Sequence, residues 1–254
     1  MHRIEPDPAA VERIAALVRP AQRVLVITGA GISADSGLPT YRGIGGIYTD
    51  ATLPDGMAIE ELLSAPTWRR DPELVWEFLA GVVRTREEVA PNRAHEVLAA
   101  WQERAHVVIL TQNVDGLHQD AGSRHVLEVH GRGRTLRCRC GWREEDVTYG
   151  DRTLPPLCPA CGAIARPDVV LFGEMLPTEP LQRLAVERGR GFDVVLSIGT
   201  SDRFPYIIAP VLQAARRGTP TVQINPGTTE LSPWVTVHAR SGAAATLGAV
   251  HDLL

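Results

Sequence analysis

Three short motifs combine residues that bind phosphate with residues that move protons. The stretch GAGISADSGLPTYRG (29–43) follows an apolar run, and its Gly29, Gly31 and Ala34 match a G-x-G-x-x-G/A dinucleotide fingerprint. Such glycines let backbone N–H groups approach a pyrophosphate at a helix N-terminus. A plain tight turn after a strand would give the same spacing, so the fingerprint alone leaves both interpretations open.

The usual dehydrogenase pattern fits this chain poorly. That pattern continues from the glycines to a second strand, which ends in an acidic residue about 20 positions further on. Here the corresponding place holds the loop-like stretch GGIYTDATLPDG, in which Asp50 and Asp55 end no recognisable strand.

The other two motifs also follow apolar runs. In TQNVDGLHQDAG (111–122), Gln112, Asn113 and Asp115 stand directly after one run, and in LEVHGR (127–132) His130 stands at the end of another. An Asn-Val-Asp-Gly turn would explain Asn113 and Asp115 without any ligand, but it does not explain Gln112. A lone histidine is more often structural than catalytic. Beside a ribose, however, an imidazole with a pKa near neutrality is a credible general base.

All four cysteines of the chain fall into two pairs, Cys138-Arg-Cys140 and Cys158-Pro-Ala-Cys161. The second pair has the C-x-x-C spacing of zinc knuckles, and the first is one residue shorter. Four thiolates would complete the coordination of Zn²⁺, so we expect a structural rather than a catalytic metal.

Apolar runs and helical spacing predict the elements that position these motifs. Short β-rich runs predict buried strands at 23–28, 106–111, 125–130, 193–199 and 221–225. Helical patterns occupy 8–18, 93–105, 176–189, 204–218 and 242–254. This alternation predicts a doubly wound α/β fold with a parallel, Rossmann-like sheet. Two segments interrupt it: 44–92, expected to hold a loop and then a helix over 65–89, and 131–166, which carries the cysteines.

The composition excludes several classes of function. A formal net charge of −4 gives no broad attraction to nucleic acid or to anionic membranes. No apolar run approaches the ~20 residues of a membrane span, and MHRIEPDPAA lacks the apolar core of a secretory signal. We therefore expect a cytoplasmic protein.

Taken together, the motifs resemble those of bacterial sirtuins, the NAD-dependent protein deacylases. GAGISADSGLPTYRG, TQNVDGLH, HG, the paired cysteines, RPDVVLFGE (166–174), GTS (199–201) and IN (224–225) occur in that family's order and spacing. The resemblance implies a Rossmann-like NAD-binding domain formed by 1–43, 93–130 and 167–254. It also implies a smaller domain formed by a helical insertion (44–92) and a zinc-binding insertion (131–166).

The resemblance further implies roles for single residues. The pyrophosphate would lie against Gly29, Ala30 and Gly31. Tyr41 would lie at the nicotinamide ribose, in a loop that Arg42 helps to order. The nicotinamide carboxamide would be held by Asp115 with Ile32, and its ribose by Gln112 and Asn113. His130 would be the general base, with Asn113 beside it in the catalytic centre.

Beyond the nicotinamide end, the resemblance implies three further sets of contacts. The adenosine side would be lined by Gly199, Thr200, Ser201, Asn225 and Ala244. An acylated peptide would add as a strand, by β-augmentation, along Val170, Phe172, Gly173 and Glu174. Zinc would be bound by Cys138, Cys140, Cys158 and Cys161.

The implied reaction is protein lysine deacetylation in which NAD is consumed as a co-substrate. The acyl oxygen attacks the ribose C1′ as nicotinamide leaves, and His130 then helps to deprotonate a ribose hydroxyl. The products are lysine, nicotinamide and O-acetyl-ADP-ribose. Mono-ADP-ribosyl transfer or NAD hydrolysis in the same pocket is the rival enzymatic hypothesis, and a non-catalytic NAD-sensing module is the rival of another class.

Two departures from the family pattern bear on specificity. After Gly-Thr-Ser the chain continues with Asp202, Arg203 and Phe204, where the family has small or apolar residues. Family members that prefer acidic acyl groups carry a Tyr and an Arg after Trp-Glu-Phe. At those positions this chain has Leu79 and Val82. The Gly45-Gly46 pair does resemble the acidic-acyl members, but the missing cation predicts a preference for acetyl or longer apolar acyl groups over succinyl.

Overall fold

The computed structural model describes residues 5–40 and 56–254, and it contains a six-stranded parallel sheet. The order β3-β2-β1-β7-β8-β9 runs outward in both directions from β1. These strands are β1 (Arg23–Thr28), β2 (His106–Thr111), β3 (Val126–Glu128), β7 (Val194–Ile198), β8 (Thr221–Ile224) and β9 (Val237–Ala239). The predicted doubly wound fold is confirmed, and β9, which the sequence did not predict, closes one edge.

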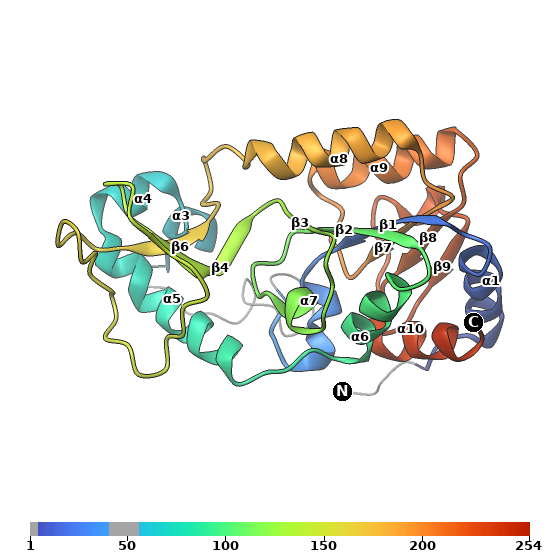
Figure 1. The fold of residues 1–254 in the computed structure, drawn as a ribbon, viewed down its shortest axis with the longest axis horizontal. Helices are drawn as coiled ribbons and strands as arrows, with labels where there is room; N and C mark the ends of the chain where they lie inside the picture. Colours follow the sequence, from blue (N-terminus) through green and yellow to red (C-terminus); the bar gives the residue numbers. More distant parts are fainter. Residues whose placement is uncertain (1–4, 41–55) are drawn as a thin grey trace.

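Helices cover both faces of this sheet (Figure 1). One layer comprises α1 (Pro8–Val18), α6 (Arg93–Trp101) and α10 (Ala243–Asp252), and the other comprises α8 (Thr178–Arg190) and α9 (Pro205–Arg216). Side chains along β1 alternate between the two cores: Val24 and Val26 pack in the first, and Leu25 and Ile27 in the second. Burial on both faces explains why the strands are continuous apolar runs. Among the helices of the described residues, none has the length and apolar character that a membrane crossing requires.

Two local expectations were wrong. The fingerprint predicts an α-helix directly after β1, but the chain forms two 3₁₀ turns, η1 (Ala30–Ile32) and η2 (Ala34–Ser36). The single helix expected over 65–89 is divided into α4 (Ala65–Arg70) and α5 (Pro72–Glu87). The division occurs at Asp71, whose side chain accepts a hydrogen bond from the backbone N–H of Leu74 at 3.0 Å and so caps α5, while Pro72 takes its first position.

The two interrupting segments share a third hydrophobic core. The first contributes α3 (Ile59–Leu62), α4 and α5, and the second forms an antiparallel sheet of β4 (Gly131–Arg137), β5 (Arg143–Glu144) and β6 (Arg166–Val169). Val75, Trp76 and Val83 of α5 pack with Leu136 of β4. The indole N–H of Trp76 donates to the carbonyl oxygen of Ala165 at 2.8 Å. Figure 1 shows these elements together at one end of the molecule, and we propose that they form one small domain.

The loops after β1 and β7 cross at very short range. The N–H of Gly31 donates to the carbonyl oxygen of Gly199 at 2.9 Å. A Cβ on Gly31 would lie 2.6 Å from the Gly199 Cα, and a Cβ on Gly199 would lie 2.5 Å from backbone atoms of Gly31 and Ile32. Gly199 also has a φ of +61°, which disfavours other residues. The fingerprint glycine at 31 is therefore required by this backbone crossing.

We expect Gly31→Ala to destabilise the fold, because the new methyl group meets backbone atoms of the neighbouring loop, which have little room to shift. Overpacking of this kind costs about 1–3 kcal/mol or more. Chemical denaturation of the wild type and of Gly31→Ala would measure this difference in stability. Gly189→Ala, in helix α8, is the matched control: its Cβ meets nothing within 4 Å, and its stability should stay within about 1 kcal/mol of the wild type. Equal stability of the two variants would contradict the crossing constraint.

Candidate active site

The motif residues meet at the carboxyl edge of the sheet, where doubly wound folds bind their ligands. Asn113, which follows β2, is 5% exposed, and its side-chain amide donates at 3.2 Å to the carbonyl oxygen of Gly29 and to Ser33 Oγ. The loops after β1 and β2 are therefore joined through one amide. The tight turn and the Asn-Val-Asp-Gly turn, considered separately in the sequence, form one structure.

Asp115 is held from three sides. Ser33 Oγ donates to its Oδ2 at 2.8 Å, and the backbone N–H of Leu117 donates to its Oδ1 at 3.0 Å. Arg86, at the end of α5, donates through Nε to the Asp115 carbonyl oxygen. A carboxylate has about four lone-pair sites, so Asp115 retains the capacity to accept a hydrogen bond from a ligand amide.

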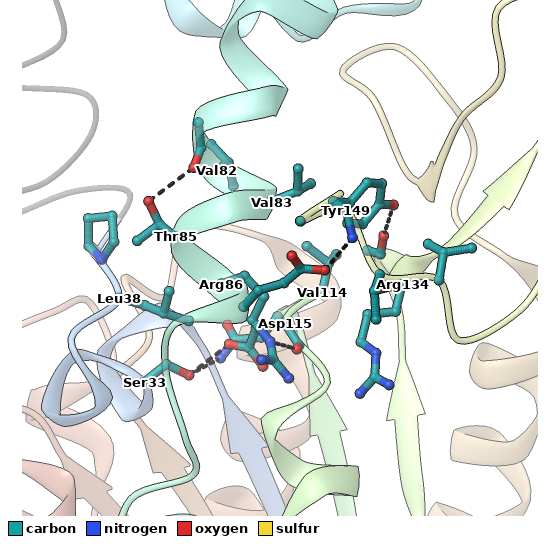
Figure 2. A pocket seen from close by; sticks show the side chains of 18 of the residues that line it. Ser33, Leu38, Val82, Val83, Thr85, Arg86, Val114, Asp115, Arg134 and Tyr149 are labelled. Atoms are coloured by element: carbon teal, nitrogen blue, oxygen red, sulfur yellow. Dashed lines mark hydrogen bonds between the residues drawn. The ribbon is translucent and has the colours of Figure 1, made fainter. Parts of the chain in front are cut away.

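A cavity of about 680 Å³ lies above this arrangement. Its polar floor includes Ala30, Ser33, Asn113 and Asp115. Figure 2 shows Val82, Val83 and Thr85 on α5 along one side, with Tyr149 opposite. The apolar wall is formed by Phe78, Val82, Val83 and Val147. Its size suits a small-molecule ligand or part of a larger one.

His130 lies just beyond β3, with both ring nitrogens occupied. Nδ1 is 2.9 Å from the carbonyl oxygen of Gln112, and a carbonyl can only accept, so Nδ1 carries the proton. Nε2, 2.7 Å from Tyr206 Oη, therefore carries the lone pair and accepts from that hydroxyl. Burial lowers the pKa of His130, and the bond to Gln112 acts in the opposite direction. The imidazole is thus a neutral base with its lone pair at a fixed place.

The predicted adenosine side is fixed by a buried carboxylate. Asp202, 1% exposed with a φ of +50°, accepts hydrogen bonds from the hydroxyls of Thr200 and Thr229 and from the amide of Gln223. The side-chain amide of Asn225 donates to the carbonyl oxygen of Thr200 at 2.8 Å. The departure after Gly-Thr-Ser therefore anchors the loop that contains Thr200 and Ser201.

Ile32 and Ala244, two further residues predicted to contact NAD, also bond within the protein. The side chain of Ile32 is fully buried, and its N–H and carbonyl bond to Gly29 and Asn92. The N–H of Ala244, at the start of α10, donates to Asp35 Oδ2 at 3.1 Å. Tyr41 and Arg42 lie outside the described residues, as do Gly45 and Gly46.

The predicted peptide segment begins beside His130. The N–H of Val170 donates to the His130 carbonyl oxygen at 2.8 Å. Phe172 uses both backbone groups: its N–H donates to Leu63, and its carbonyl oxygen accepts from Ala65, each at 2.9 Å. An added strand would therefore have to pair with other backbone groups of this segment. Glu174 bonds to Arg166 and to the N–H of Leu171.

The four cysteines form one cluster, with all sulfur atoms within 4.8 Å of one another. Cys138 and Cys161 Sγ are 3.5 Å apart, and Cys140 and Cys158 Sγ are 3.6 Å apart. A tetrahedral ion with Zn–S bonds of about 2.3 Å requires sulfurs about 3.8 Å apart. Each thiol of the short Cys-x-Cys pair therefore lies near a thiol of the second pair at about the separation that zinc needs. Burial opposes ionisation of Cys158, but N–H groups of Ala160 and Cys161 and the neighbouring thiols outweigh it and lower the Cys158 pKa to about 7.

Three residues of the site were missed in the sequence. Ser33 lies inside the first motif, where its hydroxyl was available as a signal. Arg86 reaches Asp115 from 29 positions away in the sequence, and Tyr206 reaches His130 from 76 away, so neither contact is visible as a local pattern. His118, in the motif 111–122, is structural: its buried Nε2 lies 3.0 Å from Thr28 Oγ1, and burial lowers its pKa to about 3.

Comparison with known proteins agrees with this fold. A family model described as the Sir2 family matches residues 29–204. NAD-dependent protein deacylase 2 of Pseudomonas aeruginosa is 46% identical over 234 residues, which cover 89% of this chain and 90% of that protein. A Sir2 homologue solved as an NAD complex superposes with a TM-score of 0.84 at 33% identity, covering 95% of this chain and 93% of that chain. A Sir2 structure with a deacetylated p53 peptide and 3′-O-acetyl ADP-ribose gives a TM-score of 0.83 at 27% identity, covering 95% and 97%. The chain belongs to the Sir2, or sirtuin, family.

We expect the purified protein to contain about one zinc ion per chain, bound by four thiolates. Cys158→Ser should lose most of this zinc and unfold at a lower temperature, because metal binding contributes directly to folding of such sites. Metal analysis and thermal unfolding would measure both. Leu157→Ser, an exposed neighbour, is the control and should retain the metal. A metal-free wild-type protein that is stable and active would contradict the zinc assignment.

Proposed function

We propose that this protein is an NAD-dependent protein lysine deacetylase, which transfers the acetyl group of a modified lysine to ADP-ribose. The observation that carries this proposal is His130, a neutral imidazole whose lone pair is fixed beside the loops of Asn113 and Asp115. NAD is consumed, and nicotinamide and O-acetyl-ADP-ribose are released. The similarity to an NAD-dependent protein deacylase, and to a Sir2 structure that holds a deacetylated peptide and acetyl ADP-ribose, supports the proposal.

In this reaction each part of the site has a separate task. Asp115 accepts a hydrogen bond from the nicotinamide carboxamide, and Ser33 and Arg86 hold it in place. Asn113 contacts the nicotinamide ribose from the cavity floor. After nicotinamide leaves, His130 is the general base that receives the proton of a ribose hydroxyl. The hydroxyl oxygen can then attack the acyl carbon. The partner is an acyl-lysine peptide bound beside Val170 and Gly173.

The cavity supports an apolar acyl group. Leu79 is buried in the third hydrophobic core, the small core that the two interrupting segments share, and Val82 lies on the cavity wall. The two positions that would recognise an acidic acyl group are therefore apolar. Arg86 and Arg134 do line the cavity, although the sequence predicted no cation there, but both pair with Asp120. Arg84 is exposed and is absent from the cavity lining.

The function is tested with purified protein, NAD and an acetyl-lysine peptide, with products identified by mass spectrometry. We expect O-acetyl-ADP-ribose, and we expect His130→Ala to slow its formation by about 10² or more, the scale of a general base. His251→Ala, at the far end of α10, is the histidine control and should react normally. ADP-ribosylated protein or free ADP-ribose as the main product would favour the rival transferase or hydrolase activity instead.

Acyl preference is tested with one peptide that carries either acetyl-lysine or succinyl-lysine. We expect kcat/KM to be about 10-fold or more higher for acetyl, since an uncompensated carboxylate is costly in an apolar wall. Val82→Arg should raise the succinyl-to-acetyl ratio by placing a cation there, whereas Val186→Arg, on the exposed face of α8, should leave it unchanged. A succinyl preference of the wild type would overturn the assignment.

A further inference from the structure

Tyr206 closely follows Asp202, Arg203 and Phe204, the three residues at which this chain departs from the pattern of its family. Asp202, satisfied by buried hydroxyl and amide donors, fixes the start of the segment 202–206. Pro205 then begins α9, so Tyr206 lies in its first turn. Because the loop is anchored at one end and continues as a helix at the other, the backbone of Tyr206 has a defined position.

The Tyr206 ring is also held by aromatic contacts. It stacks on Phe204, with ring centroids 5.3 Å apart and planes 14° from parallel. The His130 imidazole stands edge-on to both rings, at 5.9 Å from Phe204 and 6.0 Å from Tyr206. Such arrangements are favourable beyond the area that they bury. The contacts among these three rings therefore hold the hydroxyl of Tyr206 toward His130.

This contact limits how His130 can act. The neutral imidazole has a single lone pair, at Nε2, and Tyr206 donates to it at 2.7 Å. A ribose hydroxyl cannot give its proton to the same lone pair while Tyr206 occupies it. Either Tyr206 moves away, which breaks the hydrogen bond and the stacking, or the proton passes through Tyr206.

We propose that Tyr206 relays the proton between the ribose hydroxyl and His130, and is therefore a catalytic residue of this enzyme. The ribose O–H bond breaks as a new O–H bond forms at Tyr206 Oη. In the same step the original Tyr206 O–H bond breaks and an N–H bond forms at His130 Nε2. The ribose oxygen keeps its electron pair and bonds to the acyl carbon, while the π bond between that carbon and the lysine nitrogen breaks and its electron pair moves to the nitrogen. His130 ends as the imidazolium, and Tyr206 is neutral before and after.

Two properties of Tyr206 suit this role. Within the described residues its hydroxyl makes one hydrogen bond, the one to His130, so lone pairs on Oη remain to accept from a ribose hydroxyl. Burial raises the pKa of Tyr206 to about 12, so the phenol keeps its proton at neutral pH. The relay needs a phenol and no tyrosinate.

The inference rests on the proposed deacetylation, and Tyr206→Phe tests it by removing one oxygen while keeping the ring. We expect deacetylation to slow by about 10²-fold, as when a general base is lost. NAD affinity, and exchange of labelled nicotinamide into NAD on the acetyl peptide, should remain near the wild-type values, because nicotinamide leaves before the proton transfer. Ile208→Val, a small change on the same helix, is the control and should deacetylate normally.

A double variant sharpens the test. In a His130→Ala background, Tyr206→Phe should cause no further loss, since both residues serve one proton transfer. Losses that multiply, or an equal fall in nicotinamide exchange, would overturn the relay in favour of a binding or structural role. A Tyr206→Phe protein that deacetylates as fast as the wild type would show that Tyr206 merely moves aside. If the wild type itself forms no O-acetyl-ADP-ribose, the proposed function fails and the relay with it.

Discussion

The backbone crossing between Gly31 and Gly199 is the contact on which the rest of the site depends. It brings the loops after β1 and β7, the two central strands, within one hydrogen bond of each other. The other connections extend from it: Asn113 bonds to Gly29 on one side, and Asn225 bonds to Thr200 on the other. A dinucleotide spans such a crevice, so both of its halves would be positioned by a contact that tolerates no side chain.

The second organising feature is the connection between the segment after β2, which contains Asp115 and Asp120, and the small core. Arg86 extends from the end of α5, contacts the carbonyl oxygen of Asp115 and pairs with Asp120. Helix α5 also contributes Val75, Trp76 and Val83 to the small core. The position of the cavity wall relative to its floor is therefore set by an arginine at one end of α5 and by apolar packing along the rest.

Much of the fold could be predicted because its strands are buried on both faces and read as apolar runs. β9 was missed because three residues, Val237 to Ala239, carry too little periodicity. The break at Asp71-Pro72 had a local signal, a capping residue before a proline, which the longer helical pattern obscured. The 3₁₀ turns after β1 had no such signal, since they follow from the crossing with a loop about 170 residues away. Motif residues such as Asn113 and His130 could be named from sequence, but their partners Arg86 and Tyr206 come from distant elements that only the folded chain brings together.

The cavity lies between loops of the parallel sheet and the small core, and this division has an evolutionary consequence. Its floor, with Ser33, Asn113 and Asp115, belongs to loops of the parallel sheet, whereas its wall, with Phe78, Val83 and Val147, belongs to the small core. Under the proposed function, substitutions in the wall change which acyl group is accepted and leave in place the floor residues assigned to the dinucleotide. A lineage that carries this fold could therefore acquire new substrates by drift in α5 and the 147–151 segment, while the nucleotide-binding half stays the same.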